Sequence, residues 1–350
     1  MGNKKKGKKS SENTNKSKLP FVSVLTPTFN RRPFIPTMIK CFLHQTYPKE
    51  CIEWLIIDDG TDKIEELVTH IPQVKYFKYD EKMTLGKKRN LLHKKSKGDI
   101  IIYMDDDDFY PPERISYAVD ELQKNPNILC AGSSIMHIYF KHINKMYRFG
   151  PYGENHATAA TFAFKRQLLN ETTFSDEASL AEEKLFLKGF TIPMIQLDSK
   201  KTILVFSHNH NSFDKKQLLY QNPGNNRFIN ETSLTVTDFI KDEEILHFFT
   251  DEIDNLLKNY IPGEPFNKPD VIKQMNDIHK KRQERNESIT QFKNQSTQSK
   301  LDQMTLLSQE LTIENNNLKN KVTYLEKKIS QLIQEKIQEK IQEKKAIATK

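Results

Sequence analysis

The chain has 350 residues, 29% of them charged and 36% hydrophobic, which is typical of a soluble protein with one large or two medium domains. Its three cysteines, Cys41, Cys51 and Cys130, show no metal-ligand spacing and form no disulfide framework, so we expect a reducing compartment. There is neither an apolar run of the roughly 20 residues that a membrane span needs nor a secretory signal. We therefore expect a cytoplasmic protein without a transmembrane segment.

The net charge of +8 is concentrated at one end of the chain. Residues 1–18 contain seven lysines and one glutamate, and they supply +6 of it. We expect residues 1–19 to be a disordered tail, and a solubilising role is favoured over contact with anionic lipid or nucleic acid. The remainder is nearly neutral, which argues against specific nucleic-acid binding.

From residue 20 onward, apolar strand-like runs alternate with helix-like segments. Early strands are predicted at 21–26, 54–57, 74–79 and 100–104, and helices at 33–43 and 87–95. Later strands are predicted at 130–139, 161–164 and 202–206, and helices at 179–188 and 239–260, with a break at 261–265. This alternation is typical of an α/β fold with a mostly parallel sheet.

Four adjacent aspartates, Asp105 to Asp108, directly follow the apolar run at 100–104. Side chains alternate along an extended chain, so Asp105 and Asp107 can point the same way. Two carboxylates there suit Mg²⁺ or Mn²⁺ and, with the ion, a phosphate-bearing substrate. A solvated acidic turn is the alternative, and the apolar run before the cluster argues against it.

Polar residues also follow two other predicted strands. Pro27-Thr28 comes after the first strand and Asp58-Asp59 after the second. In mostly parallel sheets, ligands bind beyond the carboxyl ends of the strands. The sequence therefore predicts a site at this edge of the sheet.

The order of these motifs resembles family 2 of the GT-A glycosyltransferases, an inverting, nucleotide-sugar-dependent group that includes soluble members in bacteria and large DNA viruses. The resemblance spans about residues 20–215. It rests on the motifs Val22–Arg31, Leu55–Asp62, Gly86–Asn90, Gly98–Asp108 and Pro112–Ile115. It implies a GT-A fold, and for a viral chain a location in the host cytoplasm or the virion.

The resemblance also implies roles for individual residues. Asp58 or Asp59 would hold the nucleobase or ribose. The implied nucleotide-binding residues are Thr28, Asn30, Asp58, Asp59, Arg89 and Asp106. Asp105 and Asp107 would hold Mn²⁺ or Mg²⁺, with His208, or alternatively His210, as a further ligand.

The base that deprotonates the acceptor hydroxyl is the second acid of a Glu-Asp pair in this family. Ala181-Glu182-Glu183 occupies that place, which makes Glu183 the expected base and Glu182 a possible orienting residue. Glu in place of Asp is a departure from the family pattern. Residues 153–158 are expected on the acceptor side.

Two absences favour the transfer of a single sugar. The chain lacks Gln-x-x-Arg-Trp and the membrane helices of processive synthases. The expected reaction moves one sugar, from a UDP-sugar by family habit, to a hydroxyl of a glycan, lipid or protein. One alternative is a catalytically inactive GT-A domain that acts as a coiled-coil scaffold. A nucleotidyltransferase is disfavoured, because no glycine-rich basic loop follows the first strand.

The C-terminal region shows a seven-residue repeat. Its d positions are Met304, Leu311, Leu318, Leu325 and Leu332, and its a positions include Ser308, Asn315, Val322 and Ile329. Leu at d with β-branched residues and one Asn at a favours two parallel strands, so we predict a homodimer through residues 301–339. The alternative is a single solvated helix. The predicted organisation is a tail at 1–19, a GT-A domain at 20–238, a helical linker at 239–298 and a coiled coil at 299–345.

Overall fold

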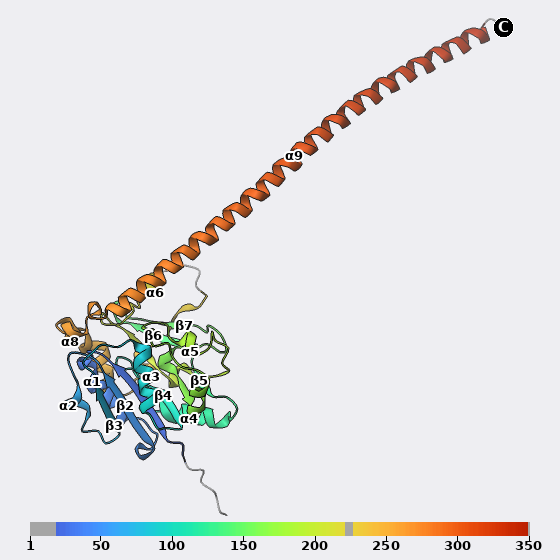
Figure 1. Cartoon of the computed structure of the whole chain (residues 1–350). Coiled ribbons are helices and arrows are strands. Elements are labelled where there is room, and N and C mark those ends of the chain that lie inside the picture. Colours follow the sequence, from blue (N-terminus) through green and yellow to red (C-terminus); the bar gives the residue numbers. More distant parts are fainter. Residues whose placement is uncertain (1–18, 221–226, 349–350) are drawn as a thin grey trace, which may run out of the picture. The chain divides into compact units, whose positions relative to one another are not determined.

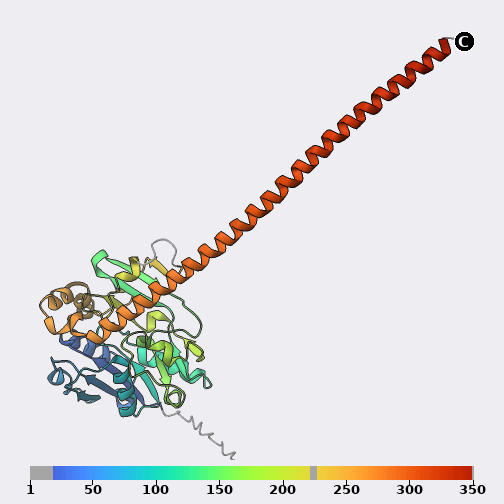
Figure 2. The ribbon, with the colours of Figure 1, turned by 45° about the horizontal axis from the view of Figure 1, so that its top comes forward.

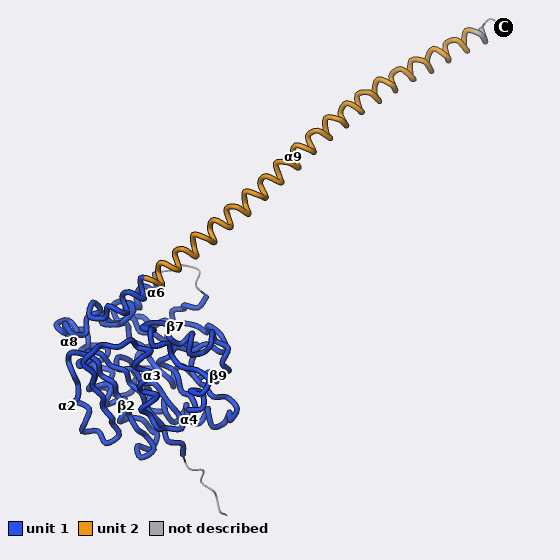
Figure 3. The backbone as a smooth tube through the Cα atoms, viewed as in Figure 1, with its two compact units in different colours: residues 1–276 blue, residues 277–350 orange. Residues whose placement is uncertain are grey.

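The computed structural model describes residues 19–220 and 227–348 (Figure 1). Residues 1–18, which belong to the tail that we expect to be disordered, therefore lie outside the described residues. The chain divides into two compact units, residues 1–276 and 277–350 (Figure 3). Residues 239–276, predicted as part of a linker, are thus grouped with the first unit.

A seven-stranded sheet with the order β3-β2-β1-β4-β8-β5-β9 organises the first unit. Its strands are β1 (Val22–Thr28), β2 (Ile52–Asp58), β3 (Val74–Lys78), β4 (Ile100–Tyr103), β5 (Cys130–Gly132), β8 (Ala163–Lys165) and β9 (Met194–Gln196). The first four are parallel neighbours, whereas β8 runs antiparallel to both β4 and β5. This confirms the predicted α/β fold with a mostly parallel sheet, to which β8 adds antiparallel pairs.

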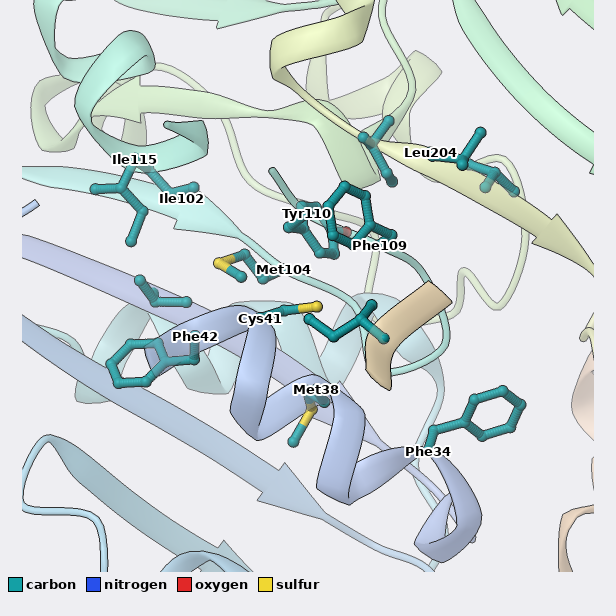
Figure 4. Close-up of a cluster of buried hydrophobic side chains, with 14 of the residues drawn as sticks. Phe34, Met38, Cys41, Phe42, Ile102, Met104, Phe109, Tyr110, Ile115 and Leu204 are labelled. Carbon is teal, nitrogen blue, oxygen red and sulfur yellow. The ribbon is translucent and has the colours of Figure 1, made fainter. Parts of the chain in front are cut away.

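Alternating apolar side chains bury both faces of this sheet. In β1, for example, Val24 belongs to one buried cluster and Leu25 to the other. Figure 4 shows part of the first cluster, to which Met38 and Phe42 of one helix and Ile102 of β4 all belong. Such strands lack an alternating polar face and read as continuous apolar runs, because helices cover both sides.

The helices of the first unit lie mainly between the strands in sequence. They are α1 (Ile35–Leu43), α2 (Glu65–Val68), α3 (Leu85–Lys95), α4 (Arg114–Lys124), α5 (Glu183–Phe186), α6 (Gln217–Tyr220), α7 (Glu243–His247) and α8 (Ile253–Lys258). Buried residues of α1 and α4 belong to one cluster, and those of α3 and α5 to the other. Pro36 lies in the first turn of α1, where its missing N–H costs nothing.

A second sheet has the order β10-β6-β7-β11. Its strands are β6 (Met136–Phe140), β7 (Lys145–Phe149), β10 (Leu204–Ser207) and β11 (Ile229–Thr232). In the turned view of Figure 2, its green and yellow strands lie above the blue strands of the larger sheet. This sheet corrects one prediction: residues 130–139 form two strands, β5 and β6, in different sheets. The Ser133 hydroxyl donates to the Ile135 carbonyl at 2.7 Å and supports the turn between them.

The predicted helix at 179–188 is also wrong in extent, because only α5 (Glu183–Phe186) forms. Ala181 has a φ of +51°, which interrupts a helix. The N–H groups of Ser179 and Leu180 donate to the side chain of Gln274, at 2.8 and 2.7 Å. Tertiary hydrogen bonds thus replace the first helical turn.

The predicted helix at 239–260 appears as α7 and α8 joined by a π-helical turn at Phe248–Glu252. Two 3₁₀ turns, Ile261–Gly263 and Pro265–Asn267, occupy the predicted break. Helix α9 (Pro269–Ala348) follows, and its residues from Asp277 onward belong to the second unit.

Within the second unit, every side chain from Lys281 to Lys345 is exposed, including the leucines of the seven-residue repeat. Helix α9 spans the whole repeat and confirms that this region is helical. Because its side chains are exposed, its pairing with another helix stays a prediction. No helix in the described ranges has the length and apolar character needed to cross a bilayer.

Candidate active site

A cavity of about 190 Å³ lies where β1 and β4 end. Its wall combines five carboxylates and five cationic side chains. These are Asp105, Asp106, Asp107, Glu182 and Asp270, and Arg31, Lys82, Lys88, Arg89 and Lys268. This density of charge in a partly enclosed space suits a charged ligand.

The four aspartates after β4 face different partners. Asp105, Asp106 and Asp107 all line the cavity, because the chain bends after Tyr103 and side-chain alternation no longer applies. Arg31 lies between two of them, with Nη2 3.1 Å from Asp107 and Nε 3.4 Å from Asp106. Asp108 instead accepts a hydrogen bond from the N–H of Phe206 at 3.2 Å. The run thus supplies three carboxylates to the site and one to the second sheet.

The crowding of these acids separates their pKa values. Burial would raise the pKa of Asp107, but Arg31 and His208 hold it well below its usual value. Burial outweighs Arg31 at Asp106 and raises its pKa to about 7. Burial likewise raises the pKa of Asp105, and Arg89 opposes it. Asp107 is therefore the acid most firmly ionised.

The two histidines after β10 have different surroundings. His208 Nε2 lies 3.2 Å from Asp107, and burial lowers the pKa of His208 to about 3, so its ring is neutral at pH 7. His210 lies 3.8 Å from Glu264, and its carbonyl accepts from Arg31 at 2.8 Å. Of the two candidate ligands, His208 is thus the one next to the aspartates.

Arg89 connects the Glu182-Glu183 pair with Asp105. Arg89 Nε lies 3.1 Å from Glu182, Nη2 lies 3.8 Å from Asp105, and the guanidinium stacks on Tyr103 at 4.2 Å. Glu182 lines the cavity, whereas Glu183, the expected base, is not among the lining residues and begins α5. Burial and then the charge of Glu182 raise the pKa of Glu183 to about 7.

Two of the residues expected to hold the nucleoside line a neighbouring cavity of about 430 Å³. Asn30 and Asp59 line it, and Phe29 and Lys82 line both cavities. Asn30 has a φ of +52°, a conformation that Asn tolerates, and its Oδ1 accepts from the N–H of Asp62 at 2.9 Å.

Two of the expected nucleotide-binding residues are buried and line neither cavity. Thr28 is 2% exposed, and its hydroxyl makes no hydrogen bond among the described residues. Asp58 accepts from the N–H groups of Gly60 and Ile64 and from the Tyr76 hydroxyl, at 2.9, 3.2 and 2.6 Å. Asp58 therefore orders the chain after β2.

The donor atoms near Asp105 are chemically suited to a divalent ion. Asp105 Oδ1 is buried and makes no hydrogen bond within the described part of the chain, and Asp107 adjoins a neutral histidine. Carboxylate and imidazole are ligands that Mn²⁺ accepts. Residues 19–220 and 227–348 nonetheless contain no group of three His, Cys, Asp or Glu side chains gathered closely enough to hold an ion as they stand.

Several residues of this site were not assigned a role from the sequence. Arg31 and Lys88 lie in the motifs Val22–Arg31 and Gly86–Asn90, which the sequence had already marked. Their membership of these motifs could have identified them as site residues. Lys88 donates to Asp59 at 2.8 Å and to the Thr28 carbonyl at 3.1 Å. Lys268 and Asp270 come from a distant segment, and no spacing in the sequence connects them with the aspartates.

Residues 23–186 match the family model described as "Glycosyl transferase family 2". An uncharacterized glycosyltransferase of Haemophilus influenzae is 26% identical over 108 residues, which cover 31% of this chain and 36% of that protein. The poly(ribitol-phosphate) beta-N-acetylglucosaminyltransferase TarS of Staphylococcus aureus is 28% identical over 109 residues, covering 27% of this chain and 18% of that protein. This chain thus spans less than half the length of these curated relatives.

Among solved structures, the mannosyltransferase PcManGT from Pyrobaculum calidifontis in complex with GDP-Man and Mn²⁺ resembles this chain with a TM-score of 0.46. It is 15% identical, and the match covers 73% of this chain and 74% of that one.

Proposed function

Residues 23–186 form a domain of glycosyl transferase family 2, and from this premise we propose that the protein transfers one sugar from a nucleotide sugar, with inversion, to a hydroxyl acceptor. The observation that carries the proposal is the cavity in which Asp105, Asp107 and Glu182 meet cationic side chains at the ends of β1 and β4. A UDP-sugar is the proposed donor, as the family resemblance implies.

We place the donor across the two adjoining cavities. The nucleoside would occupy the one lined by Asn30 and Asp59, and the diphosphate and sugar the one lined by Asp105 and Asp107. Lys82 lines both and is suited to the phosphates between them. Arg31 and Lys88 add positive charge on the same side.

The reaction is proposed to depend on Mn²⁺ or Mg²⁺. Asp105, Asp107 and His208 would hold the ion, which neutralises charge on a departing diphosphate when bound. Arg31, now against Asp107, contributes positive charge from the protein itself.

Glu183 is the proposed base, with Glu182 as the orienting residue. The raised pKa of Glu183, about 7, lies near the value at which a group can accept a proton at neutral pH. Glu182 forms an ion pair with Arg89 at 3.1 Å, which fixes its position and suits the role of an orienting residue.

The exposed leucine stripe of α9 supports the predicted partner, a second copy of this chain in a parallel coiled coil through 301–339. The acceptor is a hydroxyl of a glycan, lipid or protein. TarS, by its name, transfers N-acetylglucosamine to poly(ribitol-phosphate), and ribitol likewise offers hydroxyl groups as acceptors.

The test is a panel of UDP-, GDP- and dTDP-sugars assayed with Mn²⁺, for hydrolysis and for transfer to simple glycosides. We expect turnover of one donor, loss on chelation and recovery when Mn²⁺ is restored. Turnover that withstands both chelation and Asp107→Ala would contradict the metal dependence. Nucleotide binding without turnover of any donor, unchanged in Glu183→Ala, would instead favour the scaffold alternative.

A further inference from the structure

Residues 261–276, here called the closing segment, form one wall of both cavities. Lys268, Asp270 and Val271 line the cavity beside the aspartates, and Ile261, Pro262, Asn267 and Pro269 line the neighbouring one. The family match ends at residue 186. This wall therefore comes from a part of the chain that the family description does not cover.

The closing segment is tied to both sides of the site. Asp270 forms an ion pair with Lys82 and accepts from the Ser179 hydroxyl at 2.7 Å. On the opposite side of the neighbouring cavity, Asn30 donates to the Pro262 carbonyl at 2.8 Å. Specific polar contacts thus hold the segment over the site.

Gln274 connects the closing segment with the acidic pair. Its Oε1 accepts from the N–H groups of Ser179 and Leu180, and its Nε2 donates to the Glu177 carbonyl at 3.0 Å. Glu182 lies two residues beyond Leu180, after the strained Ala181. Gln274 therefore orders the backbone that leads to the acids.

Lys268 differs from the other cations of the cavity. Arg31, Lys82, Lys88 and Arg89 each lie within 4.0 Å of a carboxylate. Lys268 is 5% exposed, and the Ser212 hydroxyl at 3.0 Å is its hydrogen-bond partner. Within the described ranges no carboxylate forms an ion pair with it.

A buried ammonium without a counter-charge is unfavourable. Burial, and then the charge of Arg31, lower the pKa of Lys268 well below its usual value, and the charges of Asp107 and Asp106 oppose this shift. An anion that enters the cavity would favour the charged form of Lys268 and supply the direct ion pair that this side chain lacks. Because Asp106 and Asp107 face Arg31, this anion is expected on the Lys268 side.

We propose that Lys268 binds the diphosphate of the donor and that Gln274 is a positioning residue for the Glu182-Glu183 pair, so that the closing segment completes the active site. This inference rests on the proposed function. It makes the junction between the catalytic domain and α9 part of the substrate-binding machinery.

The first experiment measures nucleotide affinity by calorimetry on the full-length protein with Mn²⁺. The probes are UDP and uridine, or GDP and guanosine if the wild type prefers GDP. Lys268→Met should weaken diphosphate binding about tenfold, the usual size of a lost charged hydrogen bond, and leave nucleoside binding unchanged. Lys268→Arg should restore most of the affinity.

The matched control is Lys273→Met, which removes an exposed lysine from the same closing segment and should change neither affinity. If Lys268→Met does not fold, Lys268→Gln takes its place. Equal diphosphate affinities in the Lys268 and Lys273 variants would overturn the role of Lys268. A wild type that binds neither UDP nor GDP would instead overturn the proposed function.

The second experiment concerns Gln274→Ala. A positioning role predicts a lower kcat, with donor KM and diphosphate affinity unchanged. Equal losses in kcat and diphosphate affinity, or no loss in either, would contradict it. Gln283→Ala, on the exposed part of the same helix, is the control and should keep the wild-type kcat.

Discussion

The acids that follow β2 and those that follow β4 look alike in the sequence but have different partners in the fold. Asp58 accepts three hydrogen bonds from its own surroundings, and Asp59 accepts from Lys88 and from the N–H of Met83 at 2.6 Å. After β4, Asp105 has a buried oxygen without a hydrogen bond among the described residues, and Asp107 faces Arg31 and His208.

The difference shows that a place at a strand end does not by itself assign a role. An acid whose oxygens are saturated by backbone N–H groups orders a loop. An acid that faces cationic side chains, or has an oxygen without a hydrogen bond, is available to a ligand. Mutations in the two groups should therefore affect different measurements.

The greatest loss of activity is expected for Glu183→Gln. Removing a general base lowers rates by about 10²- to 10⁴-fold, so kcat should fall by that factor while donor affinity is retained. Glu182→Gln is the comparison variant. If the two losses are reversed, Glu182 is the base.

The pH dependence gives an independent check on the same residue. Because the pKa of Glu183 is raised to about 7, its base form is lost as the pH falls below that value. The wild-type kcat/KM should therefore decline about tenfold per pH unit below about pH 7. A profile that stays flat from pH 5 to pH 8 would exclude Glu183 as the base.

For Asp107→Asn we expect a loss of about 10²- to 10³-fold in kcat, the size typical of a lost electrostatic group in an active site. The melting temperature should hardly change, because Arg31 keeps Asp106 as a partner. A large loss of stability would place Asp107 with the acids that order loops. Steady-state kinetics measures the change in kcat, and thermal unfolding measures the change in melting temperature.

Asp58→Ala should show the opposite pattern. Three hydrogen bonds to a buried carboxylate are lost, so the free energy of unfolding should fall by about 2–3 kcal/mol. The kcat of the folded fraction should stay within tenfold of the wild type. Urea unfolding measures the first quantity, and a selective loss of kcat would contradict the structural role.

The smallest effect on activity is expected from Leu318→Lys in α9. A charge at a central d position should convert a dimer into a monomer in sedimentation experiments, because it cannot enter a coiled-coil interface. The control, Lys319→Ala at the neighbouring position, should stay dimeric. A monomeric wild type would favour the alternative of a single solvated helix.

Periodicity in the sequence predicted the large sheet well. The apolar runs at 21–26, 54–57 and 100–104 became parallel strands buried on both faces, which read as continuous apolar segments. The run at 74–79 became the parallel edge strand β3, which is only half-buried. The segments at 130–139 and 179–188 were misread. The Ser133 hydroxyl supports a local turn that divides the first segment. The course of the second depends on Gln274, which accepts from the N–H groups of Ser179 and Leu180 and lies too far along the chain for a local pattern to reveal it.

The strand-end pattern predicted a site at Asp105, Asp106 and Asp107, because the carboxyl ends of parallel strands share one edge of a sheet, and the family resemblance added Arg89 and Glu182; all five line one cavity. Only the tertiary structure separated Asp58 from that group and added Lys268 and Gln274 to the walls. Those assignments depend on which buried polar groups find partners. Such pairing is settled by residues far apart in the chain, such as Ser179 and Gln274, 95 positions apart, and Asn30 and Pro262, 232 positions apart.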